Sequence, residues 1–188
     1  DDPKNGDQPE TKPANDIDTS TLVSMANMMR KDKQFPSGRK IEPPPNLFIG
    51  GAEVPSAGKP NPEKILNKIK LGVDFFQTQY VFDKKILKNY MDVLAGSGVL
   101  EKTNFIIGLG PFSSAKSAKW MNDNLFGVDI PFEIIKRLED SKDQVKESIN
   151  ICLELISQFK EIQGVKGVHL MGPNKEEIIS EIIKESKK

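Results

Sequence analysis

Two glutamines interrupt an otherwise apolar stretch of the chain, Phe75 to Phe82, which reads FFQTQYVF. Strict alternation along a strand would put Gln77 and Gln79 on one face and Thr78 and Tyr80 on the other. An amide in a buried strand must find hydrogen-bond partners or cost stability. At a barrel mouth the amides could instead read the donor and acceptor edge of a heterocycle. The sequence leaves that reading and a structural amide bonded to neighbouring backbone equally open.

A glycine-rich turn follows a second apolar stretch and reads GLGPFSS from Gly108 to Ser114. Its glycines permit close approach of a ligand or of backbone, and its serines can cap a following helix. The turn lacks the full dinucleotide fingerprint and the P-loop lysine, so it predicts neither phosphate cradle.

Single histidine and cysteine residues restrict other chemistry. His169 is the only histidine, which makes a metal site weak and favours a core or barrel-lumen role. Cys152 is the only cysteine, so the chain has no internal disulfide, and its place on an apolar helix face indicates core packing. This cysteine usage is typical of a reducing, cytoplasmic compartment.

Four apolar runs, each followed by a turn and an amphipathic pattern, must position these residues. The runs span residues 47–52, 75–82, 105–112 and 165–171. Strands that are apolar on both faces and alternate with helices predict a parallel sheet covered by helices. A helix from about Asp18 precedes them, with Leu22, Met25, Ala26 and Met29 on one face, and residues 1–18 read as loop.

Two architectures fit four β/α units. A closed barrel takes about eight strands and roughly 250 residues, whereas this chain has 188. The candidates are therefore a small open doubly wound sheet and the C-terminal part of a (β/α)8 barrel. The polar opening of the chain, which reads as the middle of a loop, favours the second.

Charge and hydropathy exclude two classes of partner. Twenty-seven basic residues balance twenty-seven acidic ones, and the pI is about 6.8. A nucleic-acid binder or a polybasic membrane protein needs an excess of positive charge. No apolar stretch approaches the roughly 18–20 residues of a membrane span.

Taken in order along the chain, these segments resemble methylenetetrahydrofolate reductase, a flavin-dependent (β/α)8 TIM-barrel family. The most specific parts are residues 76–83 and the run from Gly108 to Pro131; the lesser ones are residues 47–52, Lys68 with Gly72, and residues 169–171 with Asn174. The resemblance implies that residues 1–188 are the C-terminal part of a single barrel domain, covering about strands 5–8.

The resemblance also implies a cytoplasmic enzyme of one-carbon metabolism and methionine biosynthesis. In this family FAD binds at the C-terminal mouth of the barrel. A reduced nicotinamide, NADH or NADPH, gives hydride to the flavin, which reduces methylenetetrahydrofolate to methyltetrahydrofolate. The protein's share of such chemistry is positioning and electrostatics around the cofactor.

Specific residues match family positions. Asp1 matches the catalytic aspartate beside the flavin, with Asp7 as a competing assignment. Lys68 matches the lysine that faces the FAD phosphates, and Asn61 falls near the adenosine side. Gln79 matches the glutamine that binds the folate pterin and later the nicotinamide.

Three departures concern substrate and cofactor contacts. Ser117 stands where some members have a glutamine that contacts substrate, and Lys175 where some have an arginine that contacts folate. Lysine keeps the charge but loses bidentate carboxylate recognition. Pro55 and Ser56 occupy a loop that in some members holds a cofactor-contacting histidine. The family's general-acid glutamate belongs to the first strand, so this chain alone is expected to be an incomplete reductase.

Two other functions stay open. A barrel of the same ancestry could act on a different pterin carrier, such as a methanopterin. Alternatively, the chain is a non-catalytic fragment or a partner-dependent half-barrel, because four parallel strands expose two edges that demand pairing. A homo-oligomer is compatible with either.

Overall fold

Four parallel strands lie side by side in chain order in the computed structural model, which describes residues 16–187. The strands are β1 (Gly50–Glu53), β2 (Phe75–Tyr80), β3 (Asn104–Leu109) and β4 (Val165–Leu170). A doubly wound sheet requires a reversal of strand order, and this sheet has none. Right-handed crossovers without a reversal bring successive helices to one face, as in a barrel wall. The predicted α/β fold with a parallel sheet is confirmed.

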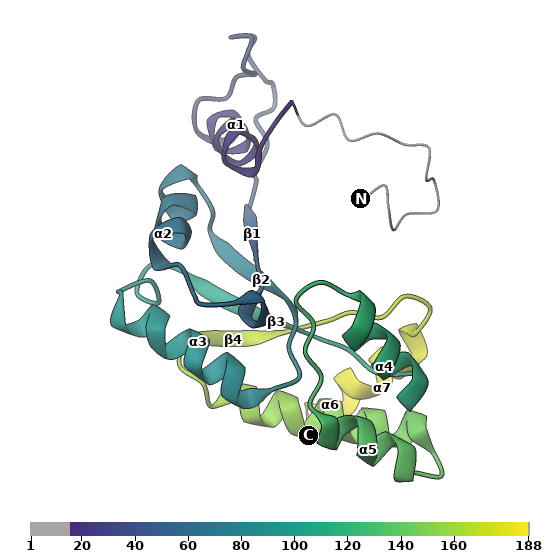
Figure 1. Ribbon diagram of the computed structural model, residues 1–188. Helices are drawn as coiled ribbons and strands as arrows, with labels where there is room; N and C mark the ends of the chain where they lie inside the picture. Colours follow the sequence, from purple (N-terminus) through teal and green to yellow (C-terminus); the bar gives the residue numbers. More distant parts are fainter. Residues whose placement is uncertain (1–15, 188) are drawn as a thin grey trace.

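Seven helices and one 3-10 turn connect and flank the strands in this part of the chain, and Figure 1 shows α3, α5 and α6 together on one side of the sheet. Their bounds are α1 (Thr19–Lys31), η1 (Pro55–Ala57), α2 (Pro62–Leu71), α3 (Lys84–Gly96), α4 (Ala115–Asn124), α5 (Phe132–Asp140), α6 (Gln144–Lys160) and α7 (Glu176–Glu185). The side chains of Asp18, Asn61 and Asp83 cap α1, α2 and α3 by accepting backbone N–H bonds, at the starts that the sequence predicts.

The sheet has one buried and one open face. Phe76 and Phe105 are adjacent in register, both fully buried, and their rings stack with centroids 5.2 Å apart. On the opposite face, Gln77 pairs with Ile106 in register; Gln77 is exposed and Ile106 half-buried. Apolar burial against the helices therefore stabilises one face, and the described residues leave polar Gln77 in solvent on the other.

A bulge in β2 breaks the alternation that the sequence predicts. The register shifts between Gln77 and Tyr80, so that Tyr80 lies opposite Gly108. The buried hydroxyl of Thr78 holds the bulge: it donates to the Gln79 carbonyl at 2.8 Å and accepts from the Gly108 N–H at 2.9 Å. The extra residue brings Tyr80 to the Gln77 face, so the expectation that Tyr80 shares a face with Thr78 is wrong.

The first helix packs less than its pattern suggests. Of α1, only Val23 is buried, whereas Leu22 is 59% exposed and the three methionines are half-buried. Arg30 holds the helix end instead, donating to Asp74 Oδ2 at 2.5 Å and to the Gly72 carbonyl at 3.1 Å. Cys152, by contrast, is fully buried in the core, as its position predicts.

Across residues 16–187, no helix has both the length and the apolar composition needed to cross a membrane.

The close approach of β3 to the segment after β4 allows a test of the packing. A Cβ on Gly110 would lie 2.0 Å from the Met171 carbonyl oxygen, whereas one on Gly167 would meet no atom within 4 Å. We expect Gly110→Ala to lower the free energy of unfolding by about 2–3 kcal/mol, because the backbone must shift. The matched Gly167→Ala should change it by less than about 1 kcal/mol. Urea denaturation measures both values, and equal losses would contradict the observed contact.

Candidate functional site at the carboxyl ends of the strands

A partly buried charged cluster lies where β1 ends. The Lys68 ammonium, on α2, donates to Glu53 Oε1 at 2.6 Å and to the Ala52 carbonyl at 2.8 Å. The Tyr90 hydroxyl, on α3, donates to Glu53 Oε2 at 3.0 Å. The Lys68 and Glu53 side chains are only 12% and 15% exposed. Two donors from two helices therefore fix the carboxylate at the end of the strand.

Tyr90 is a permanent hydrogen-bond donor in this cluster. Burial, together with the charge of Glu53 and the hydrogen bond to it, raises the pKa of Tyr90 far above its ordinary value. The phenol stays protonated throughout the physiological range. Its role is to hold Glu53 and not to exchange protons.

A pocket of about 240 Å³ opens beside this cluster, between the end of β1 and the start of α2. Glu53, Lys68 and Tyr90 line it together with Asn61. Two further lysines, Lys59 and Lys64, also line it. The Asn61 side chain accepts from the Lys64 N–H at 3.0 Å and so caps α2. Three cations against one carboxylate, at a helix N-terminus, give this pocket a net positive lining that favours an anion such as a phosphate.

Gln79 faces a loop that lies far away in sequence. Its Nε2 donates to the Phe126 carbonyl at 3.3 Å, and its Oε1 accepts from the Tyr80 N–H at 3.0 Å. Phe126 belongs to the connection between α4 and α5. The amide is thus bonded to backbone through one of its two N–H groups, and a ligand could use the second N–H or displace the Phe126 carbonyl.

Ser117 lies in the first turn of α4, which follows β3, and Lys175 directly precedes α7, which follows β4. The Ser117 hydroxyl donates to the Ser114 carbonyl at 2.8 Å and accepts from the Ser114 N–H at 3.0 Å, within the capping box of α4. The Lys175 ammonium donates to the Pro111 carbonyl at 2.6 Å. Burial lowers the pKa of Lys175 from its ordinary value.

His169 pairs in register with Gly108 and is half-buried, on the face of the sheet that carries Gln77. Residues 16–187 contain no group of three His, Cys, Asp or Glu side chains placed to hold a metal ion.

The structure brings only part of the predicted site together. Asn61 and Lys68 share one pocket. Gln79, Ser117 and Lys175 are not among the described residues that line it. Asp1, and Asp7 as its competitor, lie outside the described residues.

Glu53 and Phe126 are contact residues that the sequence analysis did not single out. The signal for Glu53 is a carboxylate directly after the apolar run that ends at Ala52, where a buried strand should continue apolar. Phe126 has no comparable local signal, because only the folded chain brings its carbonyl to Gln79.

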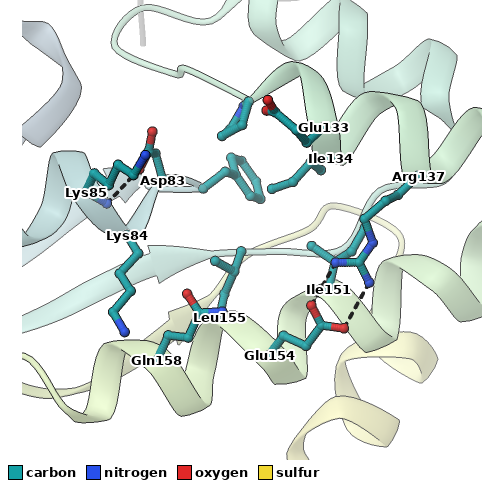
Figure 2. Close-up of a pocket in the computed structure, with 12 residues that line it drawn as sticks. Asp83, Lys84, Lys85, Glu133, Ile134, Arg137, Ile151, Glu154, Leu155 and Gln158 are labelled. Carbon is teal, nitrogen blue, oxygen red and sulfur yellow. Dashed lines mark hydrogen bonds and ion pairs between the residues drawn. The ribbon is translucent and has the colours of Figure 1, made fainter.

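A larger pocket, about 300 Å³, lies in the helix layer between α3, α5 and α6. Figure 2 shows Asp83, Lys84 and Lys85 along one side and Arg137 and Glu154 along another. Ile134, Ile151 and Leu155 supply its apolar lining.

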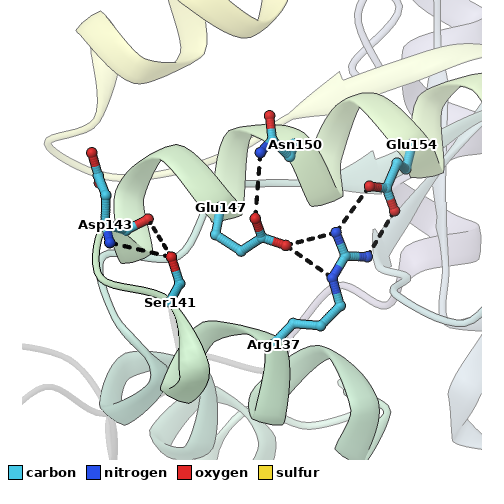
Figure 3. A network of polar contacts seen from close by, with 6 residues as sticks. All are labelled: Arg137, Ser141, Asp143, Glu147, Asn150 and Glu154. Atoms are coloured by element: carbon cyan, nitrogen blue, oxygen red, sulfur yellow. Dashed lines mark hydrogen bonds and ion pairs between the residues drawn. The ribbon is translucent and has the colours of Figure 1, made fainter.

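The main cation of this larger pocket is already committed to neighbouring carboxylates. Arg137 donates from Nε to Glu147 at 2.9 Å, and from its two terminal nitrogens to Glu154 at 2.7 and 2.9 Å (Figure 3). Asn150 donates to the other Glu147 oxygen at 3.3 Å. Arg137 therefore clamps α5 to α6, and the pocket offers no such free guanidinium for a ligand.

Comparisons with known proteins give a family and a number of solved structures with a similar fold. A family model described as methylenetetrahydrofolate reductase matches residues 2–187. Among solved structures, an uncharacterized protein from Clostridium thermocellum, described as binding two copies of 5-methyl-5,6,7,8-tetrahydrofolic acid, superposes with a TM-score of 0.62 at 19% identity. The alignment covers 91% of this chain and 59% of that chain, so this chain spans less than two thirds of its neighbour. No curated protein sequence matches the chain significantly.

The Arg137 clamp predicts an acid-sensitive contribution to stability. The hydrogen bond from Arg137 holds the pKa of Glu154 below its ordinary value. Its stabilisation is therefore present above the pKa of an unfolded glutamate and is lost as pH falls through the lowered folded value. Because the pair is partly exposed, Arg137→Met should cost only about 0.5–1 kcal/mol at pH 7.

Urea denaturation at pH 7 and pH 3 measures the effect of Arg137→Met. The difference from the unmodified chain should shrink toward zero at pH 3. Lys136→Met, which removes the exposed neighbouring cation on α5, is the control and should change little at either pH. A loss for Arg137→Met that is equally large at both pH values would contradict the clamp.

Proposed function

The chain belongs to the methylenetetrahydrofolate reductase family, and from this membership we propose that it forms part of a flavin-dependent reductase of methylenetetrahydrofolate. The product is methyltetrahydrofolate, the electron donor is NADH or NADPH, and the setting is cytoplasmic one-carbon and methionine metabolism. The chain would supply strands 5–8 of one (β/α)8 barrel domain. Its four strands in chain order suit such a wall.

The observation that carries the proposal is the pocket shared by Asn61 and Lys68. The resemblance assigns these two residues to the same cofactor, and they line one cationic pocket although they come from opposite ends of α2. At about 240 Å³, this pocket is smaller than the roughly 300–1,000 Å³ of whole-ligand sites. It therefore suits the phosphate portion of FAD rather than the whole dinucleotide.

The lysines that line the pocket suit the phosphate portion of FAD. Lys59, Lys64 and Lys68 offer point charges for phosphate oxygens. Glu53 opposes them, because it neutralises Lys68 until an anion competes for the ammonium. When bound, the flavin supplies hydride transfer between the nicotinamide and the folate carrier.

Other residues would bind and orient the substrate. Gln79 presents a donor and an acceptor to one planar edge, as recognition of a pterin or of a nicotinamide amide requires. Lys175 would offer a cation to the folate carboxylates, and Ser117 a hydroxyl in the first turn of α4. Asp1 would stand beside the flavin. The methyltetrahydrofolate bound by the Clostridium thermocellum protein supports a folate-type ligand.

A partner-dependent half-barrel without catalysis is the second candidate. Phe48 is 75% exposed and stacks on Phe75, and Gln77 is exposed on the open face of the sheet. Each of the two outer strands, β1 and β4, is paired on one side only in this sheet. Another half-barrel that closed the sheet would pair the free edges of β1 and β4 and cover the exposed side chains of Phe48 and Gln77.

One experiment separates the two candidates. The protein, purified from its complete reading frame, is examined for a flavin absorption spectrum and for oxidation of NADH or NADPH that depends on methylenetetrahydrofolate. Bound FAD with turnover supports the reductase. A colourless protein that takes up no added flavin and catalyses no reduction rejects it and leaves the half-barrel.

The opposing charges of Lys68 and Glu53 predict opposite effects on flavin binding. Lys68→Met should weaken FAD binding about tenfold, because it removes a phosphate-facing charge. Glu53→Gln should strengthen binding severalfold, because it frees Lys68 from its carboxylate. Quenching of flavin fluorescence during titration measures both affinities.

Lys70→Met is the matched control for this pair of variants. Lys70 is an exposed lysine on the same helix outside the pocket, and its loss should leave the affinity unchanged. General destabilisation would weaken binding in both the Lys68 and the Glu53 variants. A lower affinity for Glu53→Gln would therefore contradict the assignment of the pocket.

A further inference from the structure

The segment between α4 and α5 crosses toward β1 and carries an exposed phenyl ring. Phe126 is 77% exposed, although its backbone is held on both sides. Gly127, at φ +70°, packs so closely on the β1–η1 segment that a Cβ there would lie 2.1 Å from Val54 Cγ1. The Ile130 N–H donates to Asn122 Oδ1 at 2.8 Å, and Val128 and Ile130 are buried. The backbone is thus fixed while the ring remains in solvent.

Phe126 is also hydrogen-bonded to Gln79, the glutamine predicted to bind the substrate. The Phe126 carbonyl accepts from Gln79 Nε2 at 3.3 Å, across 47 positions of sequence. Among the described aromatic residues, Phe126 takes part in none of the ring stacks, which involve Phe48, Phe75, Phe76, Phe105, Tyr80, Phe82, Phe112 and Tyr90. The residue whose carbonyl the Gln79 amide contacts therefore carries an exposed ring with no ring partner, and that amide can recognise the edge of a planar heterocycle.

We propose that Phe126 forms one wall of the substrate site, where its ring packs against the reduced pterin whose edge the Gln79 amide recognises. The hydrogen bond between Gln79 and the Phe126 carbonyl places the wall before the ligand arrives. When the pterin binds, the second N–H of Gln79 Nε2 donates to a pterin acceptor while the first keeps its bond to the Phe126 carbonyl, and the heterocycle covers the ring.

Gln79 and Phe126 can together recognise the edge and the face of a heterocycle. An amide satisfies the in-plane donor and acceptor groups of a heterocycle, whereas a phenyl ring packs on its face or edge. Because Gly127 and Ile130 already hold the backbone of the loop, little conformational freedom is left to lose on binding. Phe126 is thus a residue that determines affinity for the pterin and takes no part in proton or hydride transfer.

This inference rests on the proposed folate-type function, and its test keeps the two separate. The probe is 5-methyltetrahydrofolate, titrated calorimetrically into the full-length protein in the form in which it purifies. Phe126→Ala should raise the dissociation constant about tenfold, equivalent to about 1.4 kcal/mol. Phe126→Tyr keeps the ring and should stay within about threefold of the unmodified protein.

Phe132→Ala is the matched control. Phe132 is 68% exposed at the start of α5, and it makes no hydrogen bond to Gln79 among the contacts of the described chain. This variant should bind the probe normally. A nuclear Overhauser effect between labelled phenylalanine ring protons and the pterin should be lost in Phe126→Ala and kept in Phe132→Ala, which a merely structural role for Phe126 would not produce.

The other outcomes are distinct. If the unmodified protein binds the probe and Phe126→Ala binds it equally well, the inference is overturned while the folate function stands. If the unmodified protein binds no probe, both are overturned. If Phe126→Ala and Phe132→Ala lose affinity for the probe equally, the loss is explained by general destabilisation of the segment between α4 and α5. The proposed role of the Phe126 ring is then rejected.

Discussion

Parallel hydrogen bonding between strands in chain order sets the direction of every loop that carries a candidate residue. Because all four strands point the same way, their carboxyl ends meet at one edge of the sheet. Glu53, Gln79 and Pro111 therefore come to that edge from β1, β2 and β3. The buried phenylalanine stack between Phe76 and Phe105 maintains the register on which this convergence depends.

Satisfied polar groups are the second common feature of the candidate site. No buried side-chain nitrogen or oxygen in the described chain lacks a hydrogen-bond partner. Lys68 is bonded to Glu53, and Gln79 to the Phe126 carbonyl. A ligand must therefore use the N–H donors that these bonds leave over or displace a bond already made, so such bonds discriminate between ligands more than they add affinity. Affinity must come from charge in the pocket and from apolar burial, such as that of the Phe126 ring.

The elements were largely predictable, and the details of the site were not. Apolar runs, caps such as Asn61 and stops such as Gly72 act within a few residues, so helices and strands follow from local sequence. The bulge at Thr78 depends on a hydrogen bond to Gly108 on another strand, and no local pattern encodes it. The loose packing of α1 has the same origin, since its periodicity predicts a buried face but tertiary contacts bury only Val23.

By itself, the sequence determined the α/β class, the parallel sheet, the family and the burial of Cys152, because each depends on residue type and short-range spacing. Only the tertiary structure decided the unreversed strand order, the shared pocket of Asn61 and Lys68, and the pairing of Gln79 with Phe126. These contacts join residues that are distant along the chain. Their geometry follows from how helices pack on the sheet, which a single sequence read locally does not encode.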